Sequence, residues 1–481
     1  MNKILISVLL FSLSFTKNFS QTKKIPENIY SVIIQGSKYN YPVYNLNEKI
    51  YFSFDDLNIK KSSYYYKINH FDYEWKLSKI LKSEYIEGYD DNLIEFFENS
   101  YNTLVDYTNY QISIPNQDVK LKISGNYSIS IHDNNGDFLF EKKFSVINQL
   151  VSTNIKIKRS SDLDKIESHQ SMDVFINCNN CNDFSGNSSD FKLVIIKNNN
   201  WNNFKVVQNP DYFLNNTLIF KDILFEAGNE YLNFDNSRIN STNINVYKTE
   251  LNDIYETFLR TDVDRTSSIY QYNPDINGSF VINNKFDNPE IENDYSNVKF
   301  SFKPNTLNKK NRVFIIGEFN DFTLSKKHEL EPINDRFFGE FKFKQGFYNY
   351  TYCFIGQNEE LKFYSGDFWE TENKYTALVY HKKLTEKIRS ENVNQQYDFI
   401  VSRAVTNMSN FVKIVNGKIS SKNKNQLKNG ILYLKGGDLS EELKDFKHVK
   451  SFKINSYFND TFFDTKKIVY LPMPCTDKDI R

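Results

Sequence analysis

Short segments in which apolar and polar residues alternate fill the first part of the chain. This period-two pattern, rich in aromatic and β-branched residues, predicts strands. We expect them at 49–57 (KIYFSFDDL), 63–71 (SYYYKINHF), 109–115 (NYQISIP) and 126–147, with a loop-rich excursion and a turn of helix at 83–107. The last segment carries Asn135-Gly136 between two alternating arms, which predicts a hairpin. Asp133, Asn135 and Asp137 could also suggest a calcium loop, but no bidentate acid follows at the required spacing, which favours the turn.

The same alternating pattern continues through two further regions, and the pattern changes near the carboxyl end of the chain. Strand-like runs recur at 153–159, 171–178, 191–198, 217–225 and 243–251, and YNPDINGSFVI at 272–282 predicts another hairpin. SSKNKNQLKNG at 420–430 is typical of a polar linker, and the following residues predict strand, turn, short helix and strand, with Ser440 as helix cap. We therefore expect domains at 21–148, 149–293 and 294–383, followed by a divergent extension of unknown role at 384–481.

The first 20 residues predict a signal peptide. Lys3 precedes an apolar run from Ile4 to Phe15, which is too short to span a bilayer. This pattern predicts export of the protein.

Composition narrows the function classes. Among 481 residues, 60 Lys and Arg balance 60 Asp and Glu, which argues against a nucleic-acid partner, because such binding needs a basic face. Aromatic residues make up 16% of the chain, with 42 Phe and 32 Tyr, and they favour strands. An all-β protein of several domains is expected, since one core rarely grows beyond about 300 residues.

Sequence motifs for catalysis or metal binding are missing. The chain contains no G-x-G-x-x-G, P-loop, H-E-x-x-H or G-x-S-x-G pattern, and its six His are isolated from one another. Adjacent carboxylates such as Asp55-Asp56 point to opposite faces of a strand, so they form no acid–base dyad alone. We predict no catalytic, cofactor-binding or metal-binding residues.

Cys178 and Cys181 form a C-x-x-C pair in an Asn-rich loop, while Cys353 and Cys475 are remote. Three interpretations remain open: a structurally incidental pair, a local disulfide, or a metal site.

An ordered set of short motifs in the first region matches a known family. The matching pieces are Phe54-Asp55-Asp56-Leu57, Tyr66, His70, Asp72, Trp75, Glu84-Tyr85, Gly88, Ser100, Asn102-Thr103, Tyr107, Tyr110 and Ile114-Pro115-Asn116. Through them residues 52–116 resemble the first domain of the plug proteins of the Bacteroidetes type IX secretion system, and SGNYSI at 124–129 continues the match. Further similar stretches lie at 225–236, 293–302, 343–354 and 365–383. Phe71 and Phe322 depart from the pattern, standing where Cys and Trp are usual.

The resemblance implies tandem immunoglobulin-like β-sandwiches but does not extend to residues 400–481, where the local pattern suggests a small α+β extension. It implies a non-enzymatic periplasmic subunit that binds and closes the periplasmic mouth of the type IX outer-membrane translocon barrel. Such a protein would lie at the inner face of the outer membrane through protein contact, without a small-molecule ligand. Contact is expected through loops such as 83–102. The family-motif positions expected to bind the partner are Asp55, Asp56, His70, Asp72, Trp75, Tyr85, Gly88, Asn102 and Tyr107.

Two other functions compete. Residues 313–354 also resemble a glycogen-binding-type sandwich, which would make the protein a secreted carbohydrate-binding module, although Phe322 replaces the usual Trp. A secreted lyase or hydrolase is the third, but no catalytic constellation supports it. We expect Trp75 and Trp369 to be core or corner residues.

Overall fold

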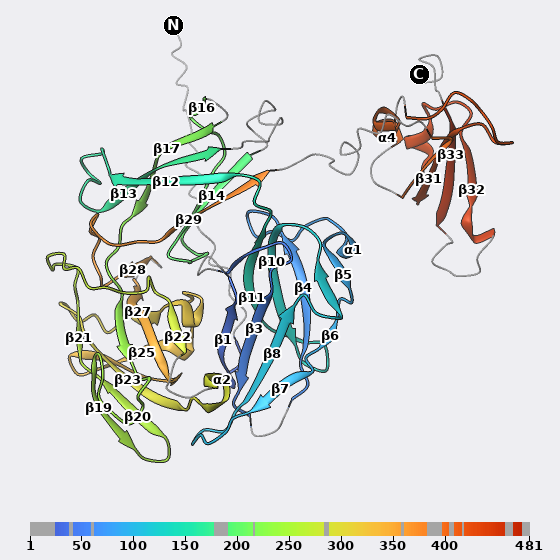
Figure 1. The fold of residues 1–481 in the computed structure, drawn as a ribbon. Helices are drawn as coiled ribbons and strands as arrows, with labels where there is room; N and C mark the ends of the chain where they lie inside the picture. Colours follow the sequence, from blue (N-terminus) through green and yellow to red (C-terminus); the bar gives the residue numbers. More distant parts are fainter. Residues whose placement is uncertain are drawn as a thin grey trace, which may run out of the picture. The chain divides into compact units, whose positions relative to one another are not determined.

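The computed structural model describes residues 25–473 except for 38–41, 59–61, 178–190, 215–216, 283–287, 357–359, 382–396, 404–407, 416–417 and 457–464. The predicted signal peptide, Cys178, Cys181 and Cys475 lie outside the described residues. The chain forms two compact units, Met1–Lys382 (unit 1) and Lys383–Arg481 (unit 2). The predicted all-β fold of tandem sandwiches is confirmed (Figure 1).

The first sandwich packs two antiparallel-dominated sheets around an aromatic core that includes Phe54, Tyr110 and Tyr127. One sheet has the order β1 (Ile29–Gln35), β3 (Ile50–Asp56), β8 (Thr108–Ile114), β7 (Phe96–Asn99). The other has the order β2 (Val43–Asn45), β11 (Phe138–Ile147), β10 (Gly125–His132), β4 (Tyr65–Phe71), β6 (Asn92–Leu93). The intervening excursion holds α1 (Lys82–Tyr85) and β5 (Ile86–Gly88), which pairs with β9 (Val119–Leu121).

The hairpin predicted at Asn135-Gly136 is present between β10 and β11. Gly136 adopts φ +84°, and the Asp133 carboxylate accepts the backbone N–H groups of Asn135 and Asp137, both at 2.9 Å. These contacts are turn chemistry, as predicted.

The second sandwich is discontinuous in sequence. One sheet orders β12 (Ser152–Arg159), β13 (His169–Asn177), β17 (Thr217–Glu226), β16 (Tyr212–Leu214). The other orders β15 (Phe204–Val207), β14 (Phe191–Lys197), β29 (Tyr375–His381). In Figure 1 the orange β29 lies beside the green β14, with Phe191 opposite His381. β29, which the sequence placed in the third domain, therefore completes the second sandwich.

The third sandwich is one continuous ladder that curls around a core of Phe and Tyr rings. Its strands, in order, are β18 (Leu232–Asp235), β27 (Gly346–Ile355), β24 (Arg312–Ile316), β25 (Glu329–Ile333), β26 (Arg336–Lys344), β23 (Tyr295–Lys303), β20 (Tyr255–Leu259) and β19 (Val246–Leu251). Side branches are β21 (Asp262–Val263), β22 (Phe280–Ile282) and β28 (Leu361–Phe363), and short helices are α2 (Pro289–Glu292), η3 (Glu318–Asn320) and η4 (Lys326–His328).

Strand pairing departs from two expectations. The domain boundary expected between residues 293 and 294 is not followed, because β18 to β20 pair within the third sandwich and β29 within the second. The hairpin predicted at 272–282 is wrong: β22 pairs with the distant β27, with Phe280 opposite Tyr348. The Asn349 side chain accepts the N–H of Ile276 at 2.7 Å, which holds this segment as a loop.

Unit 2 is a mixed α/β structure with its own core. Its sheet order is β30 (Phe399–Arg403), β31 (Gly430–Gly436), β33 (Lys466–Pro472), β32 (Lys450–Lys453). Helices α4 (Met408–Val415) and α5 (Ser440–Leu443) supply core residues, and η5 (Ile454–Ser456) follows β32. The predicted strand–turn–helix–strand order at 430–454 is confirmed. Ser440 begins α5 instead of capping it, since its Oγ donates to Asp438 at 2.6 Å.

Candidate functional site

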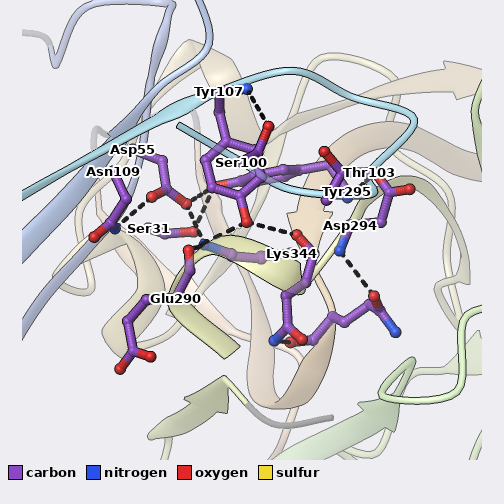
Figure 2. A network of polar contacts seen from close by, with 12 residues as sticks. Ser31, Asp55, Ser100, Thr103, Tyr107, Asn109, Glu290, Asp294, Tyr295 and Lys344 are labelled. Atoms are coloured by element: carbon purple, nitrogen blue, oxygen red, sulfur yellow. Dashed lines mark hydrogen bonds and ion pairs between the residues drawn. The ribbon is translucent and has the colours of Figure 1, made fainter. Parts of the chain in front are cut away.

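A buried polar network joins the first and third sandwiches (Figure 2). Lys344, the last residue of β26, donates from Nζ to Asp55 Oδ2 of β3 at 2.7 Å, and their side chains are 2% and 0% exposed. The alternation of β26 directs Phe341 and Phe343 into the third core, so Lys344 points outward, where the first sandwich covers it. A charged pair with so little exposure is tolerated only when further hydrogen bonds satisfy both groups.

Those further bonds are present. Tyr295 OH and Asn109 Nδ2 donate to the two oxygens of Asp55 at 2.5 and 2.7 Å. Lys344 Nζ also donates to the carbonyl of Glu290 at 2.6 Å and lies 4.2 Å from the centre of the Tyr107 ring. Burial lowers the pKa of Lys344, with Asp55 acting in the opposite sense, and burial raises the pKa of Tyr295 well above its usual value. The network therefore holds one cation in a fixed position between domains.

The end of the excursion in the first sandwich, residues 101–107, is tied to the third sandwich by backbone hydrogen bonds. Asp294 accepts the N–H groups of Leu104 and Val105 at 2.7 and 3.1 Å, and Tyr101 N donates to the carbonyl of Ile291 at 2.9 Å. Tyr107 OH donates to the carbonyl of Asn293 at 2.8 Å. Residues 101–107 are thereby fixed against α2 and the start of β23.

Contacts of the second sandwich complete unit 1. Trp75 meets Trp201 edge-on with ring centres 4.8 Å apart, and Tyr380 OH donates to Asn126 Oδ1 at 2.6 Å. A small apolar cluster including Val43, Val194 and Leu378 lies between the first and second sandwiches.

A further contact joins the first and third sandwiches: Lys142 of the first forms an ion pair with Asp321 of the third.

The nine predicted partner-binding residues fall into four groups. Asp55 and Tyr107 belong to the interdomain network, whereas Asp56 is satisfied inside the first sandwich, accepting Tyr64 OH at 2.7 Å. As expected, the adjacent carboxylates Asp55 and Asp56 have separate partners. Asp72 Oδ1 accepts the N–H groups of Glu74 and Lys76, both at 2.9 Å, and this turn holds Trp75 at φ 61° beside Trp201.

The remaining four are structural or exposed. His70 is buried, with Nδ1 2.7 Å from Ser78 Oγ, and burial lowers its pKa; Tyr85 packs against its ring. Gly88 has φ +108°, and a Cβ there would lie 1.8 Å from the carbonyl oxygen of Asp118, so glycine is required. Asn102 is exposed in the loop before Tyr107. A direct contact of these nine residues with a partner stays a prediction.

Sequence reasoning missed Lys344, Tyr295 and Asp294, whose roles depend on contacts with distant parts of the chain; Tyr295 and Lys344 lie 240 and 289 positions from Asp55. The local sequence of β26 gives no signal for Lys344, because Lys342 also occupies an outward position of this strand. Among the described residues, no group of three or more His, Cys, Asp or Glu side chains is placed to hold a metal ion.

Residues 77–104, which include the start of the tied loop, expose eight large apolar side chains. We call this set the 77–104 surface: Leu77, Ile80, Leu81, Tyr89, Leu93, Phe96, Tyr101 and Leu104. The set extends along β4, since Leu77 bridges Phe71 at one end of that strand and Leu93 pairs with Tyr65 at the other. Strands β6 and β7, which carry Leu93 and Phe96, are consecutive in the chain and form the last strands of the two sheets. Edge strands with exposed apolar residues are potential pairing sites for another protein.

Three comparisons relate the chain to other proteins. Residues 29–148 match the family model described as type 9 secretion system plug protein 1st domain. A crystal structure of a hypothetical protein from Parabacteroides merdae is similar with a TM-score of 0.69 and 27% identity, covering 76% of this chain and 95% of that one. The family model confirms the predicted plug family, and the similar crystal structure agrees with the predicted sandwich fold; the glycogen-binding resemblance stays a prediction.

A further similarity is to proteins named ribosomal RNA small subunit methyltransferase G. The relative from Flavobacterium psychrophilum is 59% identical over 97 residues, which is 20% of this chain and 46% of the relative. The relative from Christiangramia forsetii is 60% identical over 85 residues, 18% of this chain and 40% of the relative. The chain thus spans less than half the length of these curated relatives.

Proposed function

Because residues 29–148 belong to the first-domain family of type 9 secretion system plug proteins, we propose that the chain is a non-enzymatic plug subunit. It binds the periplasmic mouth of the outer-membrane translocon barrel and closes it. It resides in the periplasm at the inner face of the outer membrane, bound through protein contact.

The observation that carries this proposal is the buried network around Asp55 and Lys344. A protein that closes a wide pore must resist deformation, and its domains must not slide past one another. The ion pair, the Asp294 clamp on residues 104–105 and the Trp75–Trp201 contact each join two different sandwiches. Interfaces with such buried, satisfied polar groups fix one relative arrangement of the domains. Unit 1 is therefore suited to act as one rigid body.

The 77–104 surface supplies the docking site. Interfaces concentrate aromatic and large apolar side chains, and Tyr89 and Tyr101 are 72% and 68% exposed. The backbone of residues 101–105 is held by Ile291 and Asp294, so Tyr101 and Leu104 are presented from a fixed loop. Pre-organised loops lose less entropy on binding than mobile ones.

In this proposal the protein is held at the outer membrane through its contact with the barrel. In the part of the chain that the structure describes, none of the helices has both the length and the apolar character needed to cross a bilayer. The predicted leader would deliver the protein to the periplasm.

No observation favours the carbohydrate-binding alternative. A sugar platform needs exposed aromatic rings. Phe322, at the position where Trp is usual, is buried in a cluster with Phe314 and Ile316 and faces Tyr231. Its backbone at φ 52° keeps the ring against the third sandwich.

The proposal is tested by affinity capture. The tagged protein is purified from detergent-solubilised outer membranes of a bacterium that has a type IX system, and captured proteins are identified by mass spectrometry. We expect the large translocon barrel in stoichiometric amount. Its absence from the captured proteins, with the tagged chain folded and exported, would contradict the proposal.

A further inference from the structure

The sheet of unit 2 has a different architecture from the sandwiches of unit 1. β30 pairs in parallel with β31, and α4 lies between them in sequence, which makes a β–α–β unit. β33 is antiparallel to both β31 and β32, so β30, β31 and β32 share one direction. Parallel strands joined through helices are typical of doubly wound α/β domains, not of immunoglobulin-like sandwiches.

The length of unit 2 agrees with the length over which the methyltransferase relatives match this chain. Unit 2 spans residues 383–481, and the Flavobacterium psychrophilum relative matches over 97 residues. The plug first-domain model occupies residues 29–148 in unit 1, and the similar Parabacteroides merdae structure covers 76% of the chain, about the share of unit 1. We infer that the methyltransferase-like stretch is unit 2, and that unit 2 is the carboxyl-terminal half of a doubly wound domain whose open side binds the missing amino-terminal half.

Among the described residues of unit 2, helices cover one face of this sheet and leave the other face open. Ile431, Tyr433, Val469 and Leu471 point to the face that packs against α4 residues such as Phe411. The register places the alternate residues of the same strands on the opposite face. These opposite-face residues include Phe399, Val401, Leu432, Leu434, Ile468 and Phe452, together with the buried Tyr470 and the charged Lys450.

This face is mainly apolar, and most of its side chains are incompletely buried in the described part of unit 2. Val401 is 65% exposed and Phe452 is 41% exposed, and Leu432, Leu434 and Ile468 are only partly buried. Sheets built from parallel strands are normally covered by helices on both faces, because their strands are apolar on both sides. Among the described residues of unit 2, α4 and α5 contribute to the core of the covered face.

The edge strand β30 indicates the same partner, the amino-terminal half of the doubly wound domain. β30 is the first described strand of unit 2 and one of the two edge strands of its sheet, next to β31. In a doubly wound sheet the later strands extend outward from the point where the strand order reverses, so the first of them lies beside a strand from the earlier half. The curated relatives extend over more than twice the length that this chain matches. Their remaining part is the partner whose strand and helices fit this edge and face.

Fragment complementation tests the inference. The portion of the Flavobacterium psychrophilum relative outside its matched 97 residues is co-expressed with the tagged full chain. We expect the fragment to co-purify in equimolar amount, with cross-links to residues 397–473. Val401→Asp and Phe452→Asp should each reduce capture at least tenfold. The matched control Val263→Asp, an exposed valine of β21 in unit 1, should leave capture unchanged.

Three outcomes would overturn the inference: no captured fragment, capture by the two unit 2 variants equal to that of the wild type, or cross-links confined to unit 1. Circular dichroism verifies that the variants stay folded, and both substituted side chains are exposed in the wild type. The result is independent of the plug proposal, which is scored by capture of the translocon barrel.

Discussion

Lys344 and Asp55 lie 2.7 Å apart although 289 positions separate them in the chain. Each comes from a different sandwich, and neither is accessible to water. The pair therefore reports directly on whether the first and third sandwiches stay together. Removing one partner leaves the other as an uncompensated buried charge, which is costly, whereas removing both can be nearly neutral.

We expect Asp55→Ala to lower the free energy of unfolding of unit 1 by about 3–5 kcal/mol, because Lys344 then loses its counter-ion inside the protein. The double variant Asp55→Leu with Lys344→Met should recover most of that loss. Urea unfolding followed by tryptophan fluorescence measures both. Lys76→Ala, which breaks the exposed pair with Glu74, is the control and should leave the unfolding midpoint unchanged. A single variant as stable as the wild type would show that the pair does not hold the domains.

Acid should destabilise unit 1 through His328. This side chain is buried among Phe319, Phe341 and Phe343, and burial lowers its pKa to about 3. The unfolded chain binds a proton near pH 6.5, whereas the folded chain does not until about pH 3, so stability falls as pH drops through this window. His70, whose pKa burial also lowers, acts in the same direction.

By linkage, His328 alone should cost about 2 kcal/mol between pH 7.5 and pH 5. Urea unfolding at the two pH values measures the loss, and His328→Phe should make it smaller. The His328 ring resonance in an NMR titration provides a direct check. A midpoint near pH 6.5 in the folded protein would contradict the assignment.

The 77–104 surface should bind the translocon without stabilising the fold. Leu81→Ser, Tyr89→Ser and Tyr101→Ser together should reduce barrel capture at least tenfold, since exposed aromatic anchors dominate interface energies. The melting temperature should change little, because exposed side chains contribute little to folding. The matched control substitutes Tyr212, Phe213 and Leu214, three exposed residues of β16 in the second sandwich. Capture that falls equally for the control would place docking elsewhere.

The third sandwich should have no glucan affinity. Phe322 is buried, so it offers no flat ring to a sugar. Isothermal titration with α- and β-glucans should detect no binding tighter than the millimolar range, which corresponds to about −4 kcal/mol. Tighter binding that Phe322→Ala abolishes would instead support a carbohydrate-binding module.

Local patterns in the sequence predicted local structure well. The β10–β11 hairpin, β3, β4, β8 and the short helix in the 83–107 excursion all depend on residues close to one another in the chain. Alternation and turn chemistry act over that range, so they can be read from the chain directly.

Long-range pairing could not be predicted in the same way. The return of β29 to β14 and the ion pair of Lys344 with Asp55 leave no periodic signal, because any strand edge or outward lysine has the same local sequence. The hairpin predicted at 272–282 is wrong for the same reason. Asn277-Gly278 does form a turn, with Gly278 at φ +82°, but the strand that follows pairs with the distant β27. Tertiary contacts decided these features.

Outer-membrane permeability is the most direct test of the plug role. A barrel wide enough to export proteins leaks when it is open, so deleting the gene should admit large antibiotics that intact cells exclude. The leak should disappear when the barrel gene is deleted as well, and the wild-type plug gene should restore the seal. We predict hypersensitivity to vancomycin in the single deletion alone. A single deletion strain that excludes vancomycin as well as the wild type does, in cells shown to make the barrel, would contradict the proposed function.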